Sequence, residues 1–173
     1  MYLPRVAIPV ATMDTARMSK SLKRIEAALA EAGVDTEVLE MDGETRTAAD
    51  AAREASCEID QIAKSIIFRG ETSGQTVLFV TAGGNQVDAE KASTLAGEAL
   101  GRADAAFVRE MTGFAIGGVA PVAHRVAPIA FFDPRLLAFS VVYAAAGTPR
   151  HIFGIAPDVL LTLSGATQAD FTV

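Results

Sequence analysis

A glycine-rich segment at residues 112–121, here called the glycine loop, is the part of the sequence best suited to backbone chemistry. Gly117 and Gly118 lack a Cβ, so the chain there can adopt positive φ and let another molecule approach closely. Pro121 fixes its own φ and favours an extended conformation at Ala120. Such a loop presents backbone N–H groups that can stabilise a carbonyl or a developing oxyanion. Taken alone, these ten residues also fit an ordinary connection between a helix and a strand.

Lys64 is the side chain that best complements this loop. It stands immediately before the apolar run at residues 65–68, so a short strand fixes where its ammonium group begins. A lysine at the rim of a sheet is a mobile point charge suited to a phosphate or a polarised carbonyl. A solvated flanking charge is the alternative. His151 opens a strand after the turn at Gly147, and it is either a site residue or an ordinary exposed or hydrogen-bonded histidine.

Several other kinds of site are not indicated. The sequence contains no G-x-x-x-x-G-K-[ST] phosphate loop, no G-x-G-x-x-G after a strand and no G-x-S-x-G elbow. A zinc site would need carboxylates to join the two histidines and Cys57 at unremarkable spacings, so no metal and no cofactor are expected. Cys57 follows an alanine-rich helix, and we expect packing as a small hydrophobe in preference to a dyad with a histidine. His124 is expected at the surface.

The composition is that of a globular protein. The chain has 173 residues, of which 50% are hydrophobic and 21% are charged, and this length suits one domain with a substantial core. No apolar run is long enough to span a bilayer, and the opening residues lack the pattern of a signal peptide. The single cysteine excludes an internal disulfide. A cytoplasmic protein is therefore expected.

The charge distribution limits the size of any nucleic-acid contact. The net charge of −6 argues against a broad basic face that coats nucleic acid. From Met111 onward three arginines and three aspartates cancel, so the acidic excess lies before that point. A local contact with RNA is compatible with this distribution, whereas DNA and membranes are not expected as partners.

The apolar periodicity predicts helices and strands that are interleaved without regular βαβ alternation. Two strand pairs are expected to form hairpins, which favours a mixed or mainly antiparallel sheet in an α+β fold. The expected helices lie at residues 14–33, at 47–55 with Thr47 as cap, at 88–100 closed by Gly101, at 104–110 capped by Asp104, from Asp133, and from Pro157 to Gly165. The expected strands lie at residues 37–41, 64–68, 76–81, 128–132, 141–144, 151–155 and 168–173.

Three segments, at residues 61–68, 112–121 and 142–147, occur in an order and spacing that resemble the YbaK/prolyl-tRNA-synthetase-associated family of aminoacyl-tRNA editing domains. The resemblance covers about Ser19 to the C-terminus. It divides the chain into an N-terminal extension at residues 1–18 and a single editing domain at 19–173. It implies an α+β fold with a mixed, largely antiparallel, barrel-like sheet flanked by helices. It also implies hydrolysis of the ester that joins a wrong amino acid to tRNA.

The resemblance assigns roles to individual residues. Lys64 matches the family's essential lysine, which is expected to orient the tRNA 3′ end or its aminoacyl carbonyl. Gly117 and Pro121 match the ends of a Gly-x-x-x-Pro loop that includes Gly118, and its backbone lines the aminoacyl pocket. The other substrate-binding positions implied by the resemblance are Met41, Ser65, Val119, Ala120, Gly147 and, as the counterpart of a working histidine, His151.

An aminoacyl ester is already activated, and the adjacent ribose hydroxyl can help to position or deprotonate water. The protein then has to place the substrate and stabilise the oxyanion. A pocket floored by residues 117–120 would admit small side chains such as those of alanine, cysteine or serine. The resemblance therefore implies a free-standing deacylase of mischarged tRNA, with a synthetase as a candidate partner. The alternatives are a non-catalytic module that binds tRNA 3′ ends or small amino-acid derivatives, and a hydrolase of small aminoacyl esters unrelated to translation.

Overall fold

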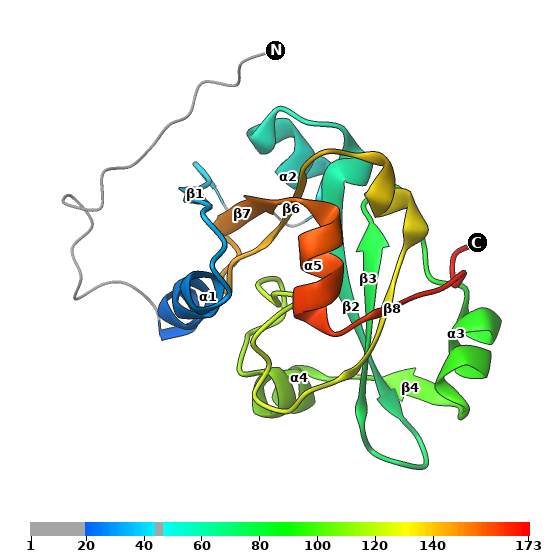
Figure 1. Cartoon of the computed structure of the whole chain (residues 1–173). Helices are drawn as coiled ribbons and strands as arrows, with labels where there is room; N and C mark the ends of the chain where they lie inside the picture. Colours follow the sequence, from blue (N-terminus) through cyan, green and yellow to red (C-terminus); the bar gives the residue numbers. More distant parts are fainter. Residues whose placement is uncertain (1–19, 44–46) are drawn as a thin grey trace.

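A mixed sheet of eight strands forms the centre of the computed structural model, which describes residues 20–43 and 47–173 (Figure 1). The predicted start of the first helix and the predicted extension at residues 1–18 lie outside the described residues. The elements in chain order are α1 (Lys20–Glu31), β1 (Val38–Glu40), α2 (Ala48–Ala55), η2 (Ile59–Gln61), β2 (Ile62–Gly70), β3 (Thr76–Ala82), α3 (Ala89–Ala96), β4 (Leu100–Arg102), α4 (Ala105–Thr112), β5 (Ile129–Phe132), η3 (Pro134–Ala138), β6 (Val142–Ala145), β7 (His151–Ile155), α5 (Pro157–Ser164) and β8 (Thr167–Gln168).

The sheet combines antiparallel and parallel pairs in the order β1-β7-β6-β2-β3-β5-β8, with β4 also paired to β2. The two predicted hairpins are confirmed, because β2 pairs antiparallel with β3 and β6 pairs antiparallel with β7. The pairs β2–β6, β3–β5 and β5–β8 are parallel and join segments far apart in the sequence. The predicted α+β class with a mixed, largely antiparallel sheet and flanking helices is confirmed.

The outer edge of β2 is only partly covered by neighbouring strands. β6 pairs with its first two residues, Ile62 and Ala63, and β4 pairs with its last three, from Phe68 to Gly70. Between them, residues 64–67 pair with β3 on one side. On the other side, none of the described strands pairs with them. Figure 1 shows β4 and α4 near the turn of the long β2–β3 hairpin and α2 near its opposite end. The sheet therefore has a gap along β2.

Most helix ends are where the capping residues predict them. Thr47 accepts a hydrogen bond from the Asp50 N–H at the start of α2, and Asp104 accepts one from the Phe107 N–H at the start of α4. Gly113 and Gly165 end α4 and α5 in the left-handed conformation. Asp104 and Gly113 thus set the two ends of α4, and the glycine loop begins where this helix stops.

Two predicted boundaries are wrong. The helix expected to reach Leu100 ends at Ala96, because Gly97 adopts a left-handed φ of 74° and caps it. The residues that follow form β4, whose Gly101 pairs with Arg69 of β2. At the C-terminus the regular strand is shorter than expected and lies at Thr167–Gln168, with one further bridge between Val87 and Thr172.

The largest core cluster holds both ends of the glycine loop. Phe114 and Ala120 have no exposed surface and pack among residues of α1, β3, β5, η3 and α5. Burial of an aromatic ring on one side of the loop and a methyl group on the other stabilises the loop through apolar contacts. The segment between them is consequently held at both ends. Among the helices of the described chain, none combines the length and apolarity that crossing a membrane requires.

Candidate active site

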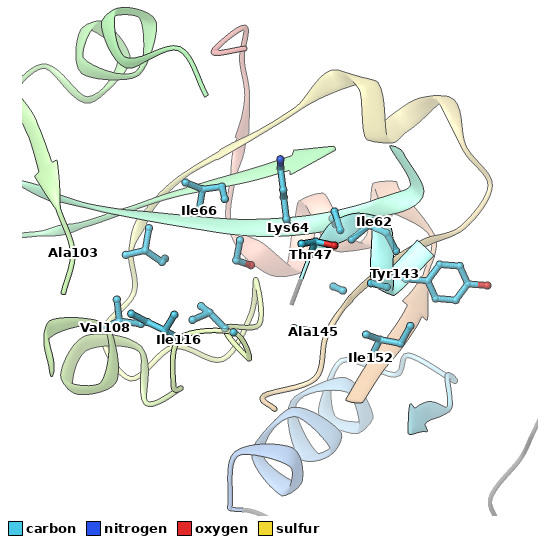
Figure 2. Close-up of a pocket in the computed structure, with 18 residues that line it drawn as sticks. Thr47, Ile62, Lys64, Ile66, Ala103, Val108, Ile116, Tyr143, Ala145 and Ile152 are labelled. Atoms are coloured by element: carbon cyan, nitrogen blue, oxygen red, sulfur yellow. The ribbon is translucent and has the colours of Figure 1, made fainter. Parts of the chain in front are cut away.

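A cavity of about 400 Å³ lies along the uncovered edge of β2. Residues 64–67 all line it, and β6 contributes Ala144 and Ala145. α2, β7, the region around the start of α4 and the glycine loop complete its wall, as Figure 2 shows with Thr47, Ile152, Val108 and Ile116. This volume falls in the range of sites that bind small molecules. The gap in the sheet thus borders a cavity of a size suited to a small molecule.

The lining is mostly aliphatic. Val108, Ile116 and Val119 form one apolar part, and the methyl groups of α2 form another. The lining residues with polar side chains are Lys64, Ser65, Thr47 and Tyr143, although the Tyr143 ring points away from Val108 and Ile116 (Figure 2). Among the described residues that line the cavity there is no carboxylate, imidazole or thiol. A reaction here would have to rely on backbone groups, hydroxyls, the lysine or the substrate itself.

The glycine loop contributes part of its backbone to this cavity. Gly117 lines the cavity and has a φ of 94°, which favours glycine. The Gly118 N–H donates to the Ala115 carbonyl at 3.0 Å, so it is used within the turn. The N–H groups of Gly117 and Val119 make no hydrogen bond among the described residues. These two donors, and not that of Gly118, are available to a ligand.

The three other predicted loop residues lie outside the lining. A Cβ on Gly118 would be 2.7 Å from the Thr148 Cα, so this glycine allows the loop to pack against the β6–β7 turn. Ala120 and Pro121 are buried behind the cavity. The structure thus separates Gly117 and Val119, which face the cavity, from Gly118, Ala120 and Pro121, which hold the loop in place.

Arg24 and His124 hold the two ends of the glycine loop. The Arg24 Nη2 donates to the Thr112 carbonyl at 2.8 Å, and its guanidinium lies 4.3 Å from the centre of the Phe114 ring. His124 Nε2 donates to the Ala120 carbonyl at 2.6 Å. Burial lowers the pKa of His124, and the positive charge of Arg24 adds to this effect. His124 was expected at the surface, and it is partly buried because its ring packs against the edge of Phe114.

Lys64 and Ser65 belong to opposite faces of β2. Lys64 is opposite Thr81 on β3 and Ser65 is opposite Val80, and successive side chains of a strand alternate between its faces. In Figure 2 the Lys64 side chain extends from β2 away from Val108 and Ile116. Burial lowers its pKa, and the charges of Asp133 and Asp60 partly oppose that shift. The ammonium group therefore lies at the rim of the cavity, on the side opposite the glycine loop.

The Ser65 hydroxyl lacks a hydrogen-bond partner among the described residues. Its oxygen is buried, although the residue lines the cavity. A buried hydroxyl without a partner is costly to the folded state and is an exception in protein interiors. It is the kind of group that a bound ligand can satisfy.

Three other predicted site residues do not line the cavity. Met41 is 5% exposed and packs behind it, in a cluster with Tyr143 and Ile152. Gly147 has a φ of 92°, and a Cβ there would be 2.9 Å from the Ser21 backbone, so it serves contact with α1. The His151 Nδ1 is hydrogen-bonded to the Thr148 hydroxyl. Met41, Gly147 and His151 thus pack around the cavity without lining it.

Neither a reactive thiol nor a metal centre adds to this site within the described residues. Burial raises the pKa of the Cys57 thiol to about 11, so the thiol is protonated at neutral pH. The described histidine, cysteine, aspartate and glutamate side chains form no cluster of three or more that could hold a metal ion.

Sequence reasoning missed the aliphatic part of the lining. Ala48 and Ala51 of α2, Val108 of α4 and Ile152 of β7 all line the cavity. In the sequence they look like ordinary core positions. Ile116 carried the one usable signal, since a large aliphatic residue in a glycine loop is often exposed, and here it is 58% exposed.

Comparison with known proteins identifies the family. The family model of the aminoacyl-tRNA editing domain matches residues 42–163. An uncharacterised protein, YwhH of Bacillus subtilis (strain 168), is 30% identical over 144 residues, which cover 83% of this chain and 91% of YwhH.

Two crystal structures are also similar. That of a proposed trans-editing enzyme for prolyl-tRNA synthetase is 43% identical with a TM-score of 0.83, and the match covers 90% of this chain and 99% of that one. The hypothetical protein APE2540 is 29% identical with a TM-score of 0.79 over 87% of this chain and 99% of that one. This chain belongs to the aminoacyl-tRNA editing domain family.

Proposed function

We propose that this protein is a free-standing deacylase that hydrolyses the ester bond of tRNA mischarged with a small amino acid. The observation that carries this proposal is the single cavity lined by Lys64, Ser65 and Gly117 in a chain of the editing-domain family. Action in trans is supported by the relative named as a proposed trans-editing enzyme for prolyl-tRNA synthetase, which is matched over 99% of its chain.

Hydrolysis in this cavity proceeds without a side-chain base from the described lining. A water oxygen attacks the ester carbonyl carbon, and the carbonyl electron pair moves onto its oxygen. The N–H groups of Gly117 and Val119 stabilise that oxyanion. The bond to the ribose oxygen then breaks, and the proton lost by the water ends on this oxygen. The neighbouring ribose hydroxyl of the substrate positions the water, and the products are the free amino acid and tRNA.

Lys64 binds the tRNA 3′ end in this proposal. Its side chain extends from β2 on the side away from Val108 and Ile116, which suits a phosphate or ribose outside the aminoacyl cavity better than the ester itself (Figure 2). The amino-acid side chain then faces Val108, Ile116 and Val119. An apolar wall of this kind favours small side chains and discriminates weakly between alanine, cysteine and serine.

The test is deacylation of a panel of mischarged tRNAs that carry alanine, cysteine, serine and, as a bulky control, phenylalanine. We expect turnover of the small amino acids and a fall in kcat/KM of about 10- to 100-fold in Lys64→Met, because a charge-assisted contact is lost. Lys23→Met changes an exposed lysine of α1 and is the matched control. Equal rates for wild type and Lys64→Met would remove the lysine from the mechanism.

The same panel separates the alternatives. Tight binding of alanyl-tRNA with no turnover would indicate a non-catalytic module, which the lining without a carboxylate or imidazole among the described residues favours as second candidate. Comparable rates on a short alanyl ester and on the whole alanyl-tRNA would indicate a hydrolase unrelated to translation.

A further inference from the structure

The backbone of Ser65 faces the gap in the sheet. Across the hairpin the Gly70 N–H donates to the Gln75 carbonyl at 2.9 Å, whereas the next residue, Glu71, donates away from β3 to the Ala99 carbonyl at 2.9 Å. Successive residues of a strand direct their N–H and C=O groups to opposite sides. Odd-numbered residues of β2 therefore direct these groups to the outer edge.

Ser65 and Ile67 are the odd-numbered residues that neither neighbouring strand reaches, and of the two only Ser65 has a polar side chain. Ala63 is covered by β6 and Arg69 by β4. Ser65 lies between them, and none of the described strands pairs with it at that edge. Its hydroxyl oxygen is also buried and unpartnered. One residue thus presents an N–H donor, a carbonyl acceptor and a hydroxyl to the cavity that it lines.

These three groups match the polar end of an aminoacyl ester. The substrate's α-ammonium only donates hydrogen bonds, and its ester carbonyl only accepts them. No carboxylate is among the described lining residues, so carbonyl and hydroxyl oxygens are the acceptors that the lining offers, and Ser65 supplies one of each. A short extended ligand can occupy a free strand edge through the same backbone bonds that a neighbouring strand would make.

We propose that Ser65 holds the amino acid of the substrate by its main-chain groups and its hydroxyl. The Ser65 carbonyl and hydroxyl oxygens accept hydrogen bonds from the α-ammonium, and the Ser65 N–H donates to the ester carbonyl. This inference rests on the proposed function and adds a recognition rule to it: the substrate needs a free α-amino group. The aliphatic wall contacts the substrate's side chain, and the edge of β2 binds the α-ammonium and ester carbonyl groups, which every aminoacyl ester has.

Substrate analogues test this rule on the whole wild-type protein. Alanyl-tRNA is compared with N-acetylalanyl-tRNA and with the α-hydroxy analogue, each rate being divided by the spontaneous hydrolysis rate of the same ester. We expect kcat/KM to fall by about 10- to 100-fold for both analogues, since hydrogen bonds to a charged group are lost. Ratios within about twofold of alanyl-tRNA would overturn the inference. Failure to hydrolyse any aminoacyl-tRNA would instead overturn the proposed function.

A matched pair of variants tests how much of the preference for a free α-amino group comes from the Ser65 hydroxyl. Ser65→Ala and Thr76→Val each remove a buried hydroxyl that has no partner among the described residues, but Thr76 does not line the cavity. Both should raise Tm, by about 2–4 °C. Only Ser65→Ala should lower kcat/KM for alanyl-tRNA, by about tenfold, and reduce the preference for alanyl-tRNA over the α-hydroxy analogue. An unchanged rate and preference in Ser65→Ala would overturn the role of the hydroxyl, whereas the main-chain contacts are tested by the substrate analogues on the wild-type protein.

Discussion

In the proposed mechanism, two neighbouring residues of β2 make different polar contacts with the substrate. Lys64 lies opposite Thr81 and Ser65 opposite Val80, so the ammonium group and the hydroxyl belong to different faces of one strand. A strand that alternates in this way can contact the tRNA end on one side and the amino acid on the other. The distance between the Lys64 and Ser65 backbones is fixed by the covalent geometry of the chain. The tRNA end and the amino acid would therefore be held at a set spacing.

His124 makes the stability of the glycine loop depend on pH. Its pKa in the folded state is lowered from the ordinary value of 6.5, so the unfolded chain binds the proton more readily. The stability that this neutral histidine contributes is present above pH 6.5 and is lost as pH falls toward its folded pKa. Gln can donate the same hydrogen bond to the Ala120 carbonyl without taking up a proton. We therefore expect His124→Gln to lose less Tm than wild type between pH 7.5 and pH 5.

Thermal denaturation at the two pH values measures this difference, with His124→Ala as the variant that loses both the proton and the hydrogen bond. Burial also lowers the pKa of His151, which lies outside the glycine loop. The loss of Tm in His151→Gln is therefore compared with that in His124→Gln. Deacylation at pH 7 should be retained in His124→Gln and reduced in His124→Ala. An equal loss of Tm in wild type and His124→Gln would show that the histidine does not contribute to the acid sensitivity.

At the scale of elements, the glycine loop is positioned by its neighbours more than by its own sequence. α1 contacts its start through Arg24, and the β6–β7 turn contacts its middle at Gly118. Gly118→Ala places a methyl group 2.7 Å from the Thr148 Cα, and a backbone atom cannot move aside as a flexible side chain can. We expect this variant to lose about 1–3 kcal/mol of stability and to reduce kcat more than it raises KM.

Gly43→Ala is the matched control, because a Cβ on Gly43 meets nothing within 4 Å. It should leave both Tm and kcat close to the wild-type values. Urea denaturation and single-turnover deacylation check the two expectations. A Gly118→Ala variant with wild-type kcat would mean that contact with the β6–β7 turn does not position the donors of the glycine loop.

The elements that the sequence predicts well are those fixed by local rules. The caps at Thr47 and Asp104 and the alternation of the β2–β3 hairpin involve residues that are close in the chain. The end of α3 was misplaced because two glycines, Gly97 and Gly101, fit a helix end equally well by sequence. Pairing of Gly101 with Arg69 decides between them, and that contact is not local.

The site residues likewise fall into those that the sequence could predict and those that it could not. Residue types indicated Lys64 and Gly117, and the family resemblance added Ser65; all three line one cavity. The aliphatic wall could not be predicted, because a residue such as Val108 or Ile152 faces a cavity or a core according to what lies opposite it. The uncovered edge at Ser65 is a property of three strands together, and it follows only once both β4 and β6 are placed against β2.

At the scale of the whole molecule, the net charge limits how the protein could bind tRNA in the proposed function. The net charge is −6, and the acidic excess lies before Met111. A protein of this kind repels an extended phosphate backbone, so affinity has to come from a few contacts at the acceptor end. A cavity of about 400 Å³ beside Lys64 is consistent with such a small footprint.

This reasoning predicts a shallow salt dependence. For each phosphate contact the slope of log K against log salt concentration is about −0.9 on a duplex and about −0.7 on a single strand. With one to three contacts near the 3′ end, we expect a slope for alanyl-tRNA binding between about −0.7 and −2.7. Lys64→Met should reduce its magnitude by about 0.7, because it removes one single-strand contact, whereas Lys23→Met should leave it unchanged. Binding titrations at several salt concentrations measure the slope, and a short acceptor-stem analogue should bind about as well as whole tRNA. A slope of about −5 or steeper would mean that the protein follows the tRNA backbone over a broad surface.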